Sequence, residues 1–372
     1  MRAMRSCHAQ RAARCMRQPT HNVSGPELAQ CRQVASDYSD VLARAPLVLL
    51  VYATSLPANW LLGRTAAPHG IPIVVAGLGR EWKSFKQKLS GARRAAQILA
   101  ALAPTRPVVL TDGTDVFFAN APSDKLVREA FIIASSGRVL AGGECNSYPN
   151  CYSSDYAQHA AFQACRRESH SHGQACYPNS GFLLSSSSTL AEALLPRLDS
   201  LARGFDARMA GNHSKHGAEA GNPDQAGVHR LYLAEDEHVR VRVDSGSDFI
   251  LNLYACAGSK HKTTRKWNVV YSYCFEEHHD PLDYLSLDNA TGYIYNESGV
   301  VRRPLLLHSN GNHERFADAR VRLHDLEARA TFQQAAAYPV LLIDAAAQST
   351  GGACTFGNLS SLSFMSHRGG RV

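Results

Sequence analysis

The chain has 372 residues, of which 45% are hydrophobic, so it is long enough for one large globular domain with a smaller attachment and is not a disordered protein. Its formal charge of +7 overstates its basic character, because five arginines precede the first acidic residue and leave only about +2 for the rest. This distribution excludes a basic stripe for nucleic acid, and no nucleic-acid partner is expected.

Membrane and export signals are not readable in the sequence. No apolar run approaches the roughly 18 to 20 residues of a membrane helix, so we expect no transmembrane segment. The Arg-rich start lacks the apolar centre of a signal peptide, and we assign residues 1–45 to an N-terminal extension. It fits a transit-like segment, a cytosolic flank of a missing anchor, or an unreliable gene start.

Cysteines and glycosylation sequons point instead to the secretory pathway. None of the ten cysteines is spaced Cys-x-x-Cys, so disulfides in an oxidising compartment fit better than a zinc ribbon. His170 and His172, beside the densest cysteine cluster, leave a zinc site open as an alternative. We therefore expect the lumen of the endoplasmic reticulum or Golgi, or secretion. The clustered cysteines are Cys145, Cys151, Cys165 and Cys176, and the sequons begin at Asn22, Asn212, Asn289, Asn296 and Asn358.

Apolar runs alternate with helical patterns through the first half of the chain. Such alternation predicts a parallel, three-layer α/β sheet. Ser90 is the expected N-cap of one helix, and Ser123 or Asp124 that of the next. The expected strands are 46–53, 71–78, 108–110 and 138–142, and the expected helices lie within 55–69, 92–102 and 125–134.

The second half begins with a cysteine-rich stretch, 144–177, which reads as a disulfide-pinned loop. The polar segment 204–221 reads as a mobile crossing loop. We place one domain over 46–326 and a peripheral tail over 327–372. Further strands are expected at 181–184, 239–243 and 305–311, the last ending in a polar turn, with helices at 190–201 and 223–233 and a hairpin at 291–303.

An apolar strand that runs straight into two carboxylates is the most informative feature. Asp112 and Asp115 follow the run 108–110, and open α/β sheets bind ligands beyond the carboxyl ends of their strands. A solvated Asp-Gly turn is the alternative. The apolar residues 116–118 favour a cation, because an uncompensated carboxylate beside buried side chains is costly. The pair predicts a hard cation with a phosphate.

Several separated motifs together resemble one family. The chain resembles the glycosyltransferase domain of the procollagen lysyl hydroxylases and, more distantly, the collagen galactosyltransferases. The resemblance extends from about Leu47 to Arg315. The matching pieces, in order, are Val51–Thr54, Gly77–Trp82, Thr111–Val116, Gly143–Glu144 with Tyr148–Pro149, Asn179–Phe182, Pro223–Gln225, Asp244 and His308–Gly311.

The resemblance implies a GT-A-like fold, a Rossmann-type three-layer mixed sheet flanked by helices. It also implies a metal site made by Asp112, Asp115 and His308. Two carboxylates and an imidazole suit Mn²⁺, with positions left open for diphosphate oxygens. The alternative for His308 is a histidine that is simply satisfied in the core.

Other matched residues are assigned by the same resemblance. Asp224 and Glu144 would be the catalytic carboxylates, although an acid in the first turn of a helix, as at Asp224, is also favoured by capping and the helix dipole. The remaining matches would contact the UDP-sugar. They are Thr54, Trp82 and Thr114 near the uridine, Asn179 and Asp244 near the sugar, and Asn310, Gly311 and Arg315 near the diphosphate.

The chain departs from the family at several of these positions. Thr114 stands where an aromatic residue commonly stacks on the base, Tyr148 replaces a tryptophan, and Glu314 stands where a lysine would meet the diphosphate. We expect a Mn²⁺-dependent transferase that moves glucose or galactose from UDP-glucose or UDP-galactose to a hydroxyl acceptor on a protein or glycan, such as hydroxylysine or galactosyl-hydroxylysine of a collagen-like protein. The alternatives are a catalytically weak sugar-nucleotide or glycan-binding protein on the same fold, and the zinc protein.

Overall fold

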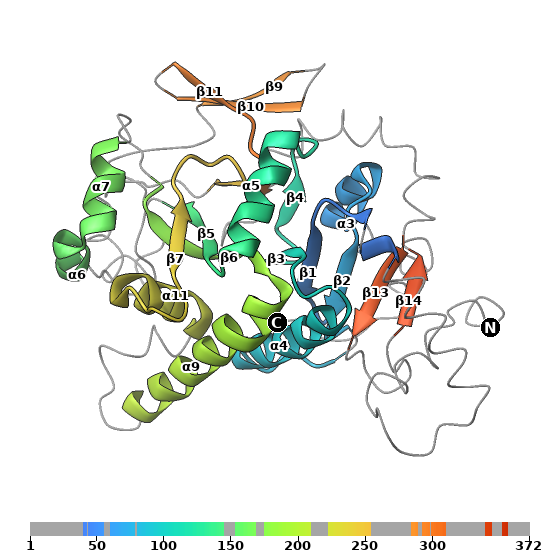
Figure 1. Cartoon of the computed structure of the whole chain (residues 1–372), viewed down its shortest axis with the longest axis horizontal. Helices are drawn as coiled ribbons and strands as arrows, with labels where there is room; N and C mark the ends of the chain where they lie inside the picture. The colour runs from blue at the N-terminus through green and yellow to red at the C-terminus, as the bar shows by residue number, and fades with distance from the viewer. Residues whose placement is uncertain are drawn as a thin grey trace, which may run out of the picture.

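The protein is an α/β structure built around one large mixed sheet with helices on both faces (Figure 1). The first half alternates strands and helices, as the hydrophobic pattern predicts. The computed structural model describes residues 40–42, 44–55, 60–78, 80–144, 153–168, 175–209, 222–253, 284–288, 292–297, 299–309, 339–343 and 352–355.

Parallel and antiparallel strands are combined in the large sheet. β1 (Val48–Tyr52) lies between β2 (Ile73–Ala76) and β3 (Pro107–Thr111), and both neighbours run parallel to it. β6 (Tyr177–Ser186) is antiparallel to β3 and to β5 (Val139–Glu144). The order is β14-β13-β2-β1-β3-β6-β5-β8-β12-β4, with β7 beside β5. The other strands are β4 (Val116–Phe118), β7 (Val241–Asp244), β8 (Ile250–Asn252), β12 (Leu306–His308), β13 (Pro339–Ile343) and β14 (Gly352–Thr355).

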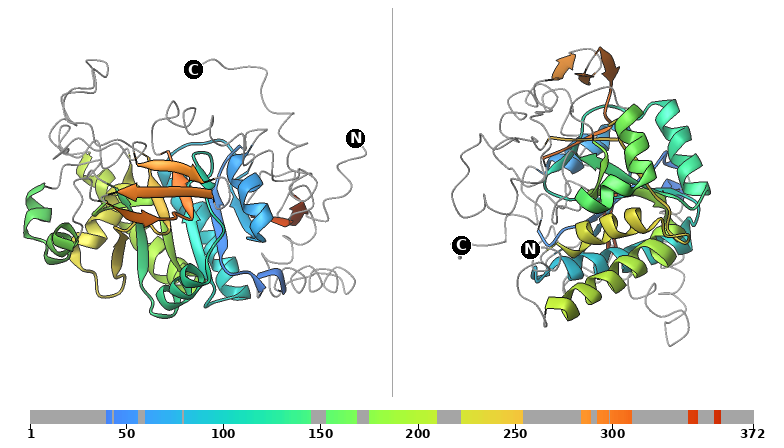
Figure 2. Two further views of the ribbon diagram at one scale, coloured as in Figure 1. Left: turned by 90° about the horizontal axis from the view of Figure 1, so that it is seen from above. Right: turned by 90° about the vertical axis from the view of Figure 1, so that its left-hand side faces the viewer.

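Alternating side chains of the central strands build two cores. Leu49 and Val51 of β1 pack toward α3 (Leu61–Ala66) and α5 (Asp124–Ser135). Val48 and Leu50 pack toward α4 (Phe85–Leu102), α9 (Leu195–Met209) and α11 (Pro223–Ala234). The side views show this second group of helices together on one face of the sheet (Figure 2). Burial on both faces accounts for the continuous apolar runs of β1 and β2.

A small three-stranded antiparallel sheet lies against the far end of the large one. It consists of β9 (Leu285–Asp288), β10 (Gly292–Glu297) and β11 (Val300–Arg302), so the expected hairpin is confirmed. Asn120 joins the two sheets, since its side-chain amide donates to the carbonyl oxygens of Tyr293 and Pro304 at 2.9 and 2.7 Å.

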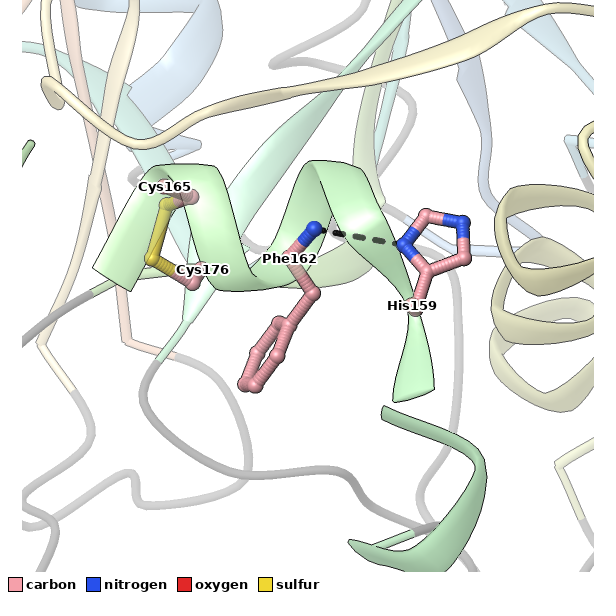
Figure 3. Close-up of a disulfide and its surroundings, with 4 residues drawn as sticks. All are labelled: His159, Phe162, Cys165 and Cys176. Carbon is pink, nitrogen blue, oxygen red and sulfur yellow. Dashed lines mark hydrogen bonds between the residues drawn. A yellow bond between two sulfur atoms is a disulfide. The ribbon is translucent and has the colours of Figure 1, made fainter. Parts of the chain in front are cut away.

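The cysteine-rich stretch contains helices. α6 (Ser153–Gln158) and α7 (Ala160–Glu168) pack beside the start of β6. A disulfide between Cys165 and Cys176 ties α7 to β6, and the backbone N–H of Phe162 donates to His159 Nδ1 at 3.2 Å (Figure 3). The expected pinning by a disulfide is confirmed, whereas the expected loop is partly helical.

Two other expectations change with the structure. α4 begins at Phe85, so Ser90 is not its N-cap, and the Ser90 hydroxyl donates to the carbonyl of Gln87 inside the helix. The helix also includes residues before Gly91, among which Lys88 and Leu89 are buried. The expected helix at 190–201 runs from α8 (Ser187–Thr189) through a π-helical segment, η3 (Leu190–Leu194), into α9.

The C-terminal segment also contributes to the sheet. β13 pairs in parallel with β2, and β14 pairs with β13 at the outer edge. A short 3₁₀ turn, η2 (Ala67–His69), completes the elements around α3. Within the described residues, none of the helices combines the length and apolar character needed to cross a bilayer.

Candidate metal centre and surrounding residues

Asp112, Asp115 and His308 converge in space although 193 positions separate the second from the third. One ligand atom from each lies within 4.8 Å of the others. His308 Nε2 is 3.5 Å from a carboxylate oxygen of Asp112 and 3.6 Å from one of Asp115. The side chain of His308 is 2% exposed, whereas those of Asp112 and Asp115 are 30% and 15% exposed. The site is therefore buried at the imidazole and open at the acids.

The strands bring the three residues together. Asp112 follows β3, Asp115 precedes β4, and β4 pairs antiparallel with β12, whose last residue is His308. The N–H of Ser309 donates to the carbonyl oxygen of Asp115 at 2.9 Å. The turn between the acids is fixed by Trp60, whose indole N–H donates to the carbonyl of Gly113 at 2.6 Å. Sheet pairing, rather than sequence proximity, thus assembles the site.

The imidazole of His308 is oriented so that one ring nitrogen points toward Asp112 and Asp115. Asn252 donates from its amide nitrogen to the carbonyl of Gly143 at 2.5 Å, which turns its Oδ1 toward His308 Nδ1 at 2.7 Å. His308 Nδ1–H therefore donates to Asn252, and Nε2 faces Asp112 and Asp115. Burial lowers the pKa of His308, but the two carboxylates outweigh this effect and raise the pKa to about 9.

The unsatisfied atoms fit a cation. Within the described part of the chain, buried side-chain atoms without a hydrogen-bond partner include Asp115 Oδ1, Asp224 Oδ1 and His308 Nε2. Leaving polar atoms unpaired in the interior is costly, and a divalent ion held by Asp112, Asp115 and His308 would give partners to the unpaired atoms of Asp115 and His308. Two carboxylates and an imidazole suit Mn²⁺ and related ions. With one ligand atom from each of the three residues, further coordination positions of the ion would remain for other ligands.

Lys88 was not predicted as part of the site. Its Nζ donates to Asp112 Oδ1 at 2.6 Å and to Asp224 Oδ2 at 2.8 Å. Burial lowers the pKa of Lys88, but Asp112 and Asp224 outweigh it and raise the pKa above its ordinary value. Burial likewise raises the pKa of Asp112, yet Lys88 and His308 hold it well below its usual range. The ammonium of Lys88 and the carboxylate of Asp112 therefore remain charged together.

A second buried group surrounds Glu144, which is 4% exposed. Asn179 donates to one carboxylate oxygen of Glu144 at 3.1 Å, and Gln225 donates to the other at 2.7 Å. Gln225 also accepts from the N–H of Ser180 at 2.6 Å, which joins α11 to β6. Because Asp224 precedes Gln225 on the same helix, this network also fixes the backbone that carries Asp224.

The residues assigned to the uridine lie beyond parallel strands. Thr54 follows β1, Trp82 follows β2, and Thr114 follows β3, so all three belong to the carboxyl edge of the sheet. Trp82 is 46% exposed, and its ring packs edge-on against Phe85 with centroids 5.4 Å apart. An exposed tryptophan at a ligand-binding edge offers a flat apolar surface to a base.

The carboxylate of Asp244 is held by hydrogen bonds from nearby backbone N–H groups. It accepts backbone N–H groups from Asp248, Phe249 and Ile250 at 3.1, 2.8 and 2.9 Å. Burial raises the pKa of Asp244 to about 7 despite these donors. The contacts fix the turn that leads into β8. A donor-sugar contact for Asp244 stays a prediction.

Several predicted residues lie outside the described residues. In the zinc alternative, the disulfide takes two of the clustered cysteines, Cys165 and Cys176. The predicted residues that the structure does not describe are Tyr148, Asn310, Gly311, Glu314, Arg315, Cys145, Cys151, His170 and His172.

The sequence gives some signal for the unpredicted residues. Lys88 falls on the same helical face as Ala92 and Ala95, four and seven residues on, which marks a lysine on an apolar face. Gln225 stands next to Asp224 in a motif already singled out. Asn252 lies in no motif. The chain matches no protein-family model and no curated protein.

Proposed function

We propose that the chain is a Mn²⁺-dependent glycosyltransferase of the GT-A type, which transfers glucose or galactose from UDP to a hydroxyl acceptor. The observation that carries the proposal is the convergence of Asp112, Asp115 and His308, with His308 Nε2 directed at both acids. The motif resemblance to the glycosyltransferase domain of the lysyl hydroxylases, which also covers residues outside the triad, supports it as well. A mixed α/β sheet with ligand residues at its carboxyl edge is compatible with it.

The transfer breaks the bond between the sugar carbon and the diphosphate oxygen and forms a bond to the acceptor oxygen. The electron pair of the broken bond leaves with UDP, and the acceptor proton passes to a base. A divalent ion held by Asp112, Asp115 and His308 would stabilise the charge on the departing diphosphate. Trp82 and Thr54 would orient the nucleotide at the open edge of the sheet.

Asp224 is the proposed carboxylate at the reacting centre. Its Oδ2 is held by Lys88 at 2.8 Å, while its Oδ1 has no hydrogen-bond partner among the described residues. That oxygen is available to stabilise positive charge on the sugar carbon or to accept the acceptor proton. Glu144, held by Asn179 and Gln225, is the second proposed carboxylate.

The proposed acceptor class follows from the resemblance, and the proposed compartment follows from the cysteines and the glycosylation sequons. Hydroxylysine and galactosyl-hydroxylysine of collagen-like proteins are the proposed acceptors. The lumen of the secretory pathway is the proposed location, which the disulfide and the exposed side chain of Asn296 in a sequon suit.

The proposal is tested by UDP release from UDP-glucose and UDP-galactose. The purified chain should release UDP with Mn²⁺ and not with EDTA, and a peptide bearing hydroxylysine or galactosyl-hydroxylysine should gain one hexose by mass. The double variant Asp112→Ala, Asp115→Ala should lose at least about a hundredfold in rate, because it removes two of the three ligands. Asp124→Ala, at an exposed position on α5, is the matched control. Robust activity of the double variant would refute the metal assignment.

A binding protein without turnover is the second candidate. Its specific support is Thr114, an exposed side chain without a ring at the position where the family stacks an aromatic residue on the base. Such a protein would gain thermal stability from UDP-sugar with Mn²⁺ but would form no UDP. UDP formation in a single turnover excludes this candidate.

A further inference from the structure

Lys88 connects two parts of the site that lie far apart in the chain. It projects from the buried face of α4, is 6% exposed, and reaches Asp112 Oδ1 at 2.6 Å and Asp224 Oδ2 at 2.8 Å. Asp112 belongs to the turn after β3, and Asp224 to the first turn of α11. A single ammonium group therefore fixes the spacing between a proposed metal ligand and the proposed catalytic carboxylate.

The two oxygens of Asp112 face different partners. Oδ1 accepts from Lys88, whereas Oδ2 is the oxygen that lies 3.5 Å from His308 Nε2. One oxygen of the Asp112 carboxylate thus contacts the ammonium of Lys88, and the other faces the proposed metal position. A metal ion and Lys88 would share the negative charge of Asp112, so each weakens the attraction of the other.

The charges of the cluster formed by Asp112, Asp115, Asp224, Lys88 and His308 can be counted. Coordination of an ion at His308 Nε2 requires the neutral imidazole, and in that state the three carboxylates and the ammonium have a formal net charge of −2, which one divalent ion neutralises. Without the ammonium, the same cluster would carry −3 and would attract cations more strongly. Lys88 therefore keeps the affinity for a divalent ion lower than the carboxylates alone would give.

We propose that Lys88 is a positioning residue that lowers the metal affinity of the triad through Asp112 and holds Asp224 beside the metal position. This inference rests on the proposed function. In this proposal, the side chain of Lys88 sets both the electrostatics of the cation site and the position of the Asp224 carboxylate. A lysine that only filled the core would affect stability but neither of these properties.

The test is direct Mn²⁺ binding to the full chain at pH 8, measured by the loss of the free-ion signal in electron paramagnetic resonance. Lys88→Met, which keeps much of the stem, should bind Mn²⁺ at least about fivefold more tightly than the unaltered chain, because a positive charge is removed within a few ångströms of the ion. Lys88→Arg keeps the charge and should stay close to the unaltered affinity. Equal affinities of the unaltered chain and Lys88→Met would overturn the proposal.

Two further variants test whether the Mn²⁺ affinity follows the net charge of the cluster. Asp224→Asn leaves Lys88 with one carboxylate fewer and should weaken Mn²⁺ binding, which can be measured even where Lys88→Met fails to fold. The double variant Lys88→Met, Asp224→Asn restores the net charge of −2 and should return the affinity to that of the unaltered chain. An Asp224→Asn variant with unchanged or tighter binding contradicts the proposal.

Turnover separates the positioning role from the electrostatic one. Lys88→Met should lose kcat with little change in the KM for UDP-sugar, since Asp224 loses its fixed position while the nucleotide contacts remain, and Lys88→Arg should recover part of kcat. A kcat equal to that of the unaltered chain would overturn the positioning role. Absence of Mn²⁺ binding by the unaltered chain would overturn the metal site itself, which is a different failure from equal affinities.

Discussion

At the scale of single residues, the site depends on how one imidazole is held. His308 is 1% exposed, and its two nitrogens have separate partners: Nδ1 donates to Asn252 at 2.7 Å, and Nε2 faces the carboxylates. Asn252 cannot reverse its amide without losing its donor bond to Gly143. The side-chain amide therefore selects the tautomer that presents a lone pair to a cation.

The titration of His308 gives a pH prediction for the metal-free protein. Its pKa is raised from 6.5 to about 9 by Asp115 and Asp112 in spite of burial, so its contribution to stability is full below pH 6.5 and is lost as the pH rises through 9. In EDTA, the free energy of unfolding of the unaltered chain should fall by about 3 kcal/mol relative to that of His308→Gln as the pH rises from 6.5 to 9. Urea unfolding at several pH values measures the difference.

Comparison with His308→Gln cancels other groups that titrate in the same range, such as Asp244, whose pKa burial raises to about 7. Parallel stability curves for the two proteins would contradict the predicted interaction between His308 and the acids.

The three proposed metal ligands could be predicted from the sequence, whereas the residues that hold them in place could not. Asp112 and Asp115 could be predicted because an apolar strand leads directly into them, and His308 because a family motif covers it. Lys88 and Asn252 could not, because their roles arise from contacts with residues 24 and 56 positions away. The sequence places Lys88 on an apolar helix face, but a lysine there ordinarily extends its ammonium to solvent, and only the structure identifies its two carboxylate partners.

At the scale of elements, glycines allow strands and turns to approach the site. A Cβ added to Gly181 of β6 would lie 2.2 Å from Cε1 of His308, and one added to Gly113 would lie 2.5 Å from a methyl group of Val51. The carbonyl of Gly181 also accepts from the N–H of Asp112 at 3.2 Å. Gly181 thus makes room for the imidazole while its backbone supports the acidic turn.

Gly181→Ala should displace His308 and weaken Mn²⁺ binding at least about tenfold, with a loss of roughly 1–3 kcal/mol in stability from overpacking. Gly204→Ala in α9 is the matched control, because its added Cβ meets no atom within 4 Å. The control should leave Mn²⁺ binding unchanged and raise stability by about 0.5–1 kcal/mol, as expected for alanine in a helix. Calorimetry of binding and unfolding measures both, and equal metal affinity in the two variants would refute the steric argument.

The elements themselves show which parts of a fold local patterns predict. β1, β2, α5 and α11 lie where periodicity and capping place them, and Ser123 does cap α5 by accepting the N–H of Leu126. The antiparallel insertion of β6 between β3 and β5 was not predicted from the alternation of elements, because strand pairing depends on distant segments. The start of α4 was misplaced because burial outweighed the low helix propensity of Gly91.

At the scale of the whole molecule, the proposed metal site joins segments that lie far apart in the chain. Asp112 and Asp115 connect β3 to β4, whereas His308 ends β12, whose chain follows the small sheet. β12 is held between β8 and β4, so separating His308 from the acids requires breaking the end of the large sheet. An ion bound by all three residues is therefore coupled to global unfolding rather than to a local loop.

This coupling predicts the effect of metal on thermal unfolding. A ligand that binds only the folded state stabilises it by RT ln(1 + [L]/Kd), or about 2.7 kcal/mol at a hundred times Kd. Mn²⁺ at that excess should raise the Tm of the unaltered chain by several degrees, and EDTA should reverse the shift. His308→Ala should abolish most of the shift, since it removes the ligand that connects β12 to the acidic turn. Scanning calorimetry distinguishes the outcomes: a single transition that moves as a whole supports the coupling, whereas an equal shift in His308→Ala places the bound Mn²⁺ elsewhere on the chain.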